Sequence, residues 1–115
     1  MTHAAFGGAG ERAIDLVHLS RQTCGDRDLE REVLALFRDQ CVRLLRVIAD
    51  AGAGDRSRNA AHTLKGAARG VGAFAVAAMA ESVEEERADF AARLSALGDA
   101  VAEARQVIDG LLEAA

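Results

Sequence analysis

Residues 29–48, LEREVLALFRDQCVRLLRVI, carry the most regular hydrophobic pattern in the chain. Large apolar residues recur there at intervals of three and four positions, which is the spacing of one face of an α-helix. They are Leu29, Val33, Leu36, Phe37, Leu44, Leu45 and Ile48. This stretch predicts an amphipathic helix, which Asp26 or Asp28 caps at its start and the DAGAGD sequence of residues 50–55 ends.

The composition of the whole chain favours helices throughout. Half of the 115 residues are hydrophobic, only 3% are aromatic and none is proline. Ala, Leu, Arg and Glu lose little on entering a helix, and the β-branched and aromatic runs that mark strands are missing. A chain of this length can bury one core without disulfides or metals. We therefore predict an all-α fold in a single domain.

Four further helices follow from the periodicity and the glycines. They are expected at residues 10–23, 55–69, 72–87 and 89–113. Asp55 is the expected N-cap of the second of these, and Gly70 and Gly72 predict a break or bend after it. The four longer helices predict an antiparallel four-helix bundle over residues 10–115, with the first helix as a cap and residues 1–9 as a flexible tail.

Charge and cysteine usage exclude several classes of function. The net charge of −4 argues against a nucleic-acid binder, and no apolar run approaches the roughly 18 residues that span a bilayer. Cys24, Cys41 and the three histidines have no chelating spacing, so we expect no metal and no other cofactor. Both cysteines are expected to be reduced core residues of a cytoplasmic monomer.

The predicted helix over residues 55–69 places one histidine on a polar face. Residues three, four and seven apart lie above one another, so one face carries Arg58, Asn59, His62, Lys65, Gly66 and Arg69. An imidazole is a nucleophile near neutral pH, two of these cations can balance a phosphoryl group, and a glycine leaves the ring unshielded. A solvated basic face with an incidental histidine would show the same pattern.

The stretch HTLKGAARGVGAFAVAAMAESVE, residues 62–84, resembles the signature of histidine-containing phosphotransfer (HPt) domains. That pattern is His-x-Leu-Lys-Gly, two small residues, and a hydrophobic-Gly-Ala further on. The matching positions are His62, Leu64, Lys65, Gly66, Ala67, Ala68, Val71, Gly72, Ala73 and Val76. Glu84 falls where the family often has an acid. The chain departs from the family at Ala67, Ala68 and Gly70, where serine or asparagine is common.

The resemblance implies a phosphorelay carrier. His62 would take a phosphoryl group from an aspartate of one response-regulator receiver domain and pass it to another, with a hybrid or sensor histidine kinase upstream. Lys65 would steady the phosphate and Gly66 would give the receiver clearance. Around this centre we expect the partner to contact Arg58, Asn59, Arg69 and Gly72.

Most other interpretations of the sequence are less well supported than a phosphorelay carrier, and one alternative stays open. Gly70-x-Gly72-x-x-Ala75 matches a dinucleotide fingerprint only superficially, because no strand precedes it. A sensor-kinase dimerisation helix is expected to have Glu after the histidine and a proline beyond; Thr63 follows here, and there is no room for an ATP-binding domain. We therefore expect a carrier and not an autokinase. A helical adaptor that docks a receiver or another protein without being phosphorylated remains the open alternative.

Overall fold

The computed structural model describes residues 13–114, and this part of the chain is helical, with no strand. Its helices are α2 (Leu16–Gln22), α3 (Arg27–Ala51), α4 (Asp55–Val71), α5 (Phe74–Glu85) and α6 (Phe90–Glu113). The prediction of an all-α fold is confirmed. The tail expected at residues 1–9 and the first residues of the helix expected at 10–23 lie outside the described residues.

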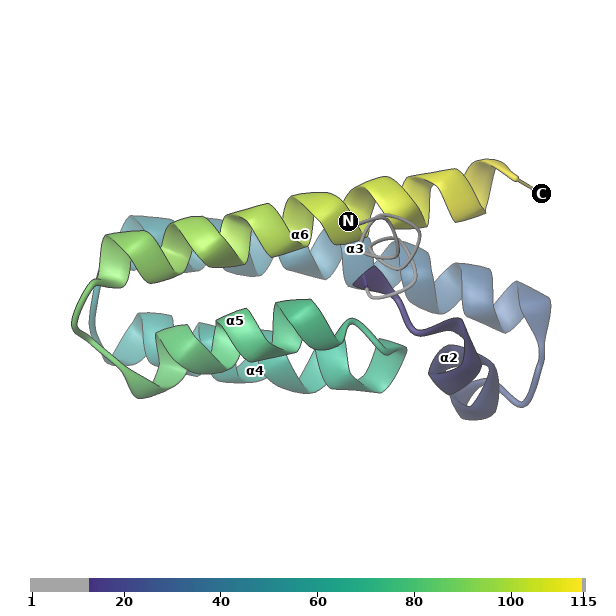
Figure 1. Cartoon of the computed structure of the whole chain (residues 1–115), viewed down its shortest axis with the longest axis horizontal. Helices are drawn as coiled ribbons and strands as arrows, with labels where there is room; N and C mark the ends of the chain where they lie inside the picture. Colours follow the sequence, from purple (N-terminus) through teal and green to yellow (C-terminus); the bar gives the residue numbers. More distant parts are fainter. Residues whose placement is uncertain (1–12, 115) are drawn as a thin grey trace, which may run out of the picture.

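Each of the four longer helices packs against two others. α3 contacts α4 and α6, and α5 contacts the same two helices, so the four surround a common interior. Figure 1 shows α3 and α6 along one side and α4 and α5 along the other, joined by short connections at alternating ends. The short helix α2 contacts α4. The interior is filled by fully buried aliphatic side chains, among them Ile48, Leu64, Val76, Leu97 and Ile108.

The apolar stripe of α3 faces the core at positions that differ in part from the predicted ones. Leu34, Phe37 and Cys41 are buried, and these positions follow the helical spacing of three and four. The prediction is wrong for Leu29 and Leu36, whose residues are 42% and 65% exposed. They are seven positions apart, so they share a face of α3 that turns away from the core.

The helix starts are set by one of the predicted caps and not by another. The Asp26 side chain accepts a hydrogen bond from the Leu29 backbone N–H at 3.0 Å, which satisfies an otherwise orphaned donor of α3. The prediction that Asp55 caps α4 is wrong, because Gly54 is the N-cap and Asp55 is the first helical residue. The buried Ser57 hydroxyl ties the start of α4 to the end of α3, where it lies within hydrogen-bond distance of the Ile48 and Gly52 carbonyls.

The predicted break between α4 and α5 occurs at Gly72 alone. α4 continues through Gly70 and ends at Val71, and Gly72 follows in the left-handed region with φ +83°. Its carbonyl accepts a hydrogen bond from the Asp15 N–H at 2.8 Å, which joins the start of α2 to the end of α4. A Cβ at Gly72 would lie 2.8 Å from the Asp15 carbonyl oxygen, so this close approach requires glycine.

The two cysteines differ in their surroundings. Cys41 is fully buried in the core, as predicted, whereas Cys24 is exposed in the turn after α2, with φ +53°. The prediction of a core position is therefore wrong for Cys24. This turn follows a helix of only seven residues, in which Leu19 is the buried residue and Val17 is exposed.

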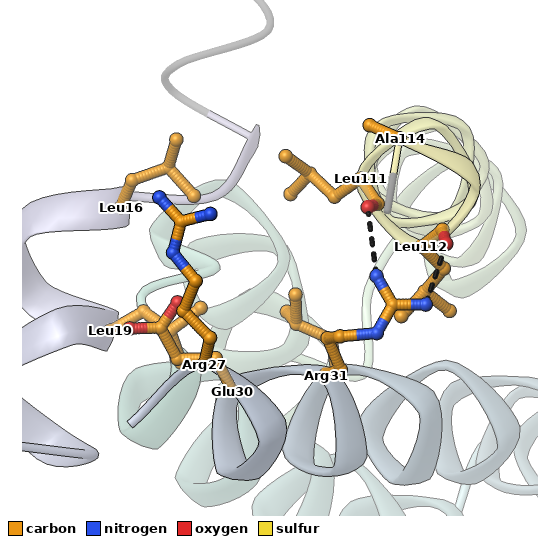
Figure 2. A pocket seen from close by; sticks show the side chains of 9 residues that line it. Leu16, Leu19, Arg27, Glu30, Arg31, Leu111, Leu112 and Ala114 are labelled. Atoms are coloured by element: carbon orange, nitrogen blue, oxygen red, sulfur yellow. Dashed lines mark hydrogen bonds between the residues drawn. The ribbon is translucent and has the colours of Figure 1, made fainter. Parts of the chain in front are cut away.

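A pocket of about 330 Å³ opens where α2, the start of α3 and the end of α6 meet. Figure 2 shows Leu16 and Arg27 on one side of it and Leu111, Leu112 and Ala114 on the other. Arg31 closes one wall, because its guanidinium donates to the carbonyls of Leu111 and Leu112 at 3.4 and 2.7 Å. It thereby satisfies carbonyls of the last turn of α6. None of the predicted site residues lines this pocket.

Candidate functional site

α4 separates a small, buried face from an exposed polar one. Ala61, Leu64 and Ala68 are fully buried against the other helices. His62 lies on the opposite face, and its side chain is 67% exposed. An imidazole in this position is held by a rigid helix and is open to a molecule approaching from solvent.

Glu84 of α5 orients the His62 ring. The two residues are 22 positions apart in sequence, and α5 brings Glu84 Oε2 to 2.6 Å from His62 Nδ1. An ionised carboxylate only accepts hydrogen bonds, so Nδ1 must be the donor. A neutral imidazole that carries its proton on Nδ1 has its lone pair on Nε2. In the neutral ring the contact therefore leaves Nε2 as the nitrogen with the free lone pair.

Lys65 keeps Glu84 ionised. Lys65 Nζ lies 2.6 Å from Glu84 Oε1, so the carboxylate contacts Lys65 through one oxygen and His62 through the other. The hydrogen bond from Lys65 is the main cause that lowers the pKa of Glu84 below its ordinary value, and His62 lowers it further. The Lys65 side chain is only 13% exposed, and its ammonium group shares the Glu84 carboxylate with His62.

Gly66 leaves open space beside His62. It lies on the exposed side of α4, and a Cβ built there would meet nothing within 4 Å. Internal packing therefore does not require glycine at this position. The space that a side chain would take at this position is left open.

Arg58 and Arg69, predicted as docking cations, are both engaged within the chain. Arg69 Nη2 lies 3.3 Å from Glu81 Oε2, and Arg58 Nε donates to the Glu84 backbone carbonyl at 3.0 Å. Arg58 also lies 3.4 Å from Asp55. Both arginine side chains remain about half exposed, so their charges are shared between the chain and solvent.

The other two residues predicted to contact a partner lie in different surroundings. Asn59 is exposed on α4, and its backbone carbonyl accepts a hydrogen bond from the Thr63 hydroxyl at 3.1 Å. Gly72 is buried at the end of α4, apart from the exposed face, and contacts Asp15. The close approach of Asp15 at the junction of α2 and α4 explains why this position is a glycine.

Glu81, which the sequence analysis did not single out, contacts Lys65 and Arg69 of the polar face of α4. Its Oε2 lies 3.3 Å from Arg69 and 4.0 Å from Lys65. A signal for it exists in the sequence: Glu81 and Glu84 are three positions apart and so share a face of one helix, as Lys65 and Arg69 do four apart on another. The sequence alone does not show that α4 packs against α5, so it could not indicate that these two faces meet.

The described part of the chain was also compared with the features of a metal site and of a membrane-spanning helix. Residues 13–114 contain no group of three His, Cys, Asp or Glu side chains that could hold a metal ion. His18, whose role the sequence left open, packs its ring against Phe74 in an edge-to-face contact at 5.2 Å. No helix within residues 13–114 has the length and hydrophobicity that crossing a membrane requires.

Comparison with known proteins identifies the family. The Hpt domain family model matches residues 32–114, which is more than half of the chain and includes most of α3 and all of α4, α5 and α6. Searches of curated proteins and of solved structures returned no match. The match covers His62, Lys65 and both glutamates that contact them, and it confirms the resemblance found in the sequence. The chain belongs to the Hpt domain family.

Proposed function

We propose that this protein is a phosphoryl carrier in which His62 takes a phosphoryl group from the aspartate of one receiver domain and gives it to another. The observation that carries the proposal is the contact between His62 Nδ1 and Glu84 Oε2 at 2.6 Å, on a ring that is otherwise exposed. In the neutral ring this contact places the lone pair on Nε2, and the side chain as a whole is 67% exposed. Membership of the Hpt domain family supports the same assignment.

The geometry suits in-line transfer to nitrogen. The Nε2 lone pair attacks the phosphorus of the aspartyl phosphate, the bond between phosphorus and the aspartate oxygen breaks, and the Nε2–P bond forms. The ring becomes cationic in this step because Nδ1 keeps its proton. The ionised Glu84 stabilises that positive charge, and Lys65, which contacts the same carboxylate at 2.6 Å, supplies a cation that can balance the phosphoryl oxygens. Transfer to the next receiver is the same step in reverse.

The remaining parts of the proposal concern the scaffold and the partners. The carrier is a monomeric, cytoplasmic antiparallel four-helix bundle that α2 caps, and it has no ATP site of its own. A hybrid or sensor histidine kinase supplies phosphate through its receiver. The receiver docks over Gly66, where there is open space, with Arg58, Asn59 and Arg69 around it. Gly72 is omitted from this surface because it is buried.

The test is transfer of labelled phosphate from phosphorylated receiver domains to the purified chain, beside His62→Gln. We expect a label on the wild type that is labile to acid and stable to alkali, and none on the variant. A chain that binds receivers but never takes the label would instead be an adaptor. In that case His62→Gln would also bind receivers as tightly as the wild type does.

A further inference from the structure

The side chains between α4 and α5 form a ladder of alternating charge. His62, Lys65 and Arg69 stand on α4, and Glu84 and Glu81 stand opposite them on α5. Glu84 joins His62 to Lys65, at 2.6 Å from each. Glu81 joins Lys65 to Arg69, at 4.0 and 3.3 Å. Lys65 is thus the central cation, and each of its neighbours in the ladder is a carboxylate.

A phosphoryl group on His62 would change the balance of this ladder. It adds about two negative charges to a ring that shares the Glu84 carboxylate with Lys65, and so it competes with both carboxylates for the ammonium group. Glu84 keeps a second donor, since His62 Nδ1–H remains after Nε2 is phosphorylated. Glu81 has no such link to the ring. It draws Lys65 and Arg69 away from the phosphoryl group, and its own charge repels that group.

We propose that Glu81 is a positioning residue that limits how strongly Lys65 and Arg69 bind the phosphoryl group on His62. The inference rests on the proposed function. It adds that one residue of the chain limits the stability of the phosphohistidine. Glu81 keeps the phosphohistidine from becoming too stable, so that the group can be passed on. The residue acts through the two cations and does not touch the reacting atoms.

The test compares Glu81→Gln with the wild type in phosphorylation by phosphoramidate, followed by ³¹P NMR. In this reaction the P–N bond of phosphoramidate breaks, the Nε2–P bond forms and ammonia leaves, so no partner protein is needed. Glu85→Gln is the matched control, because Glu85 is one turn further along α5, is exposed and has no ion pair among the described residues. Glu81→Asp keeps the charge, and circular dichroism checks that each variant is folded.

We expect Glu81→Gln to be phosphorylated roughly two- to five-fold faster than the wild type, which is the range that exposed ion pairs support. The pKa of the phosphoryl group, from the pH dependence of its ³¹P shift, should fall in the same variant, and Glu81→Asp and Glu85→Gln should stay near the wild type. Equal rates and equal phosphoryl pKa values in Glu81→Gln and the wild type would overturn the inference alone. Failure of the wild type to take phosphate on His62 would overturn the proposed function as well.

Discussion

Replacing Gly72 by alanine should destabilise the protein by about 2–3 kcal/mol. The residue has φ +83°, and holding a residue with a Cβ in the left-handed region costs about 1–2 kcal/mol. The new Cβ would also lie 2.8 Å from the Asp15 carbonyl oxygen, which is backbone and cannot rotate away. The start of α2 would have to move, which weakens the 2.8 Å hydrogen bond from Asp15 N–H to the Gly72 carbonyl, worth about 1 kcal/mol more.

Gly70→Ala is the matched control for this substitution. Gly70 lies two residues earlier, inside α4, and a Cβ there would meet nothing within 4 Å. Alanine is favoured over glycine in a helix, so this variant should gain about 0.5–1 kcal/mol. Two glycines that look alike in sequence are thus expected to respond with opposite signs.

The assay is urea and thermal unfolding of the three proteins, followed by circular dichroism. For a chain of this length about 1 kcal/mol corresponds to roughly 4 °C, so Gly72→Ala should melt about 8–12 °C below the wild type, and Gly70→Ala slightly above it. Hydrogen exchange should accelerate in α2, which is held to α4 at this junction. If Gly72→Ala unfolded within 0.5 kcal/mol of the wild type, the close approach of Asp15 would not be a constraint on the fold.

Three further predictions concern the site and the cysteines. Glu84→Gln should take phosphate from phosphoramidate about ten-fold more slowly, since the ring loses a charge-assisted hydrogen bond; an unchanged rate would remove Glu84 from the chemistry. Because the pKa of Glu84 is lowered in the folded state, its contribution to stability is present above its ordinary pKa of 4.5 and is lost as the pH falls through the lower folded value. The stability difference between wild type and Glu84→Gln in urea unfolding should therefore be larger at pH 7 than at pH 3, and a constant difference would contradict the pairing. Iodoacetamide should label Cys24 in the folded protein but not Cys41, because burial raises the pKa of the Cys41 thiol to about 12; mass spectrometry of labelled peptides decides this, and equal labelling would refute it.

The helices and the exposed position of His62 could be predicted from sequence, because both depend on spacing along one segment. The errors occur where a second segment decides the outcome. Leu36 continues a run of apolar residues, but α4 and α6 pack on the other side of α3 and leave it outside. Asp55 is a favoured capping residue, yet Gly54 takes the N-cap position and the helix starts one residue earlier. The contacts of Glu81 could not be predicted, because they depend on how α5 is aligned against α4. No pattern within one segment contains that information.

The small residues around His62 help to explain how an all-helical protein builds this site. On α4, Ala61 and Ala68 are fully buried, and on α5 the same is true of Ala80. Helices that meet through alanine approach more closely than helices that meet through leucine, because interaxial distance follows the side chains at the contact. Close approach allows a glutamate on α5 to reach a histidine on α4 at 2.6 Å while the histidine side chain stays 67% exposed. The buried alanines and the charge ladder are thus two faces of one helix pair, and the packing of the alanines sets the distances between the charged groups.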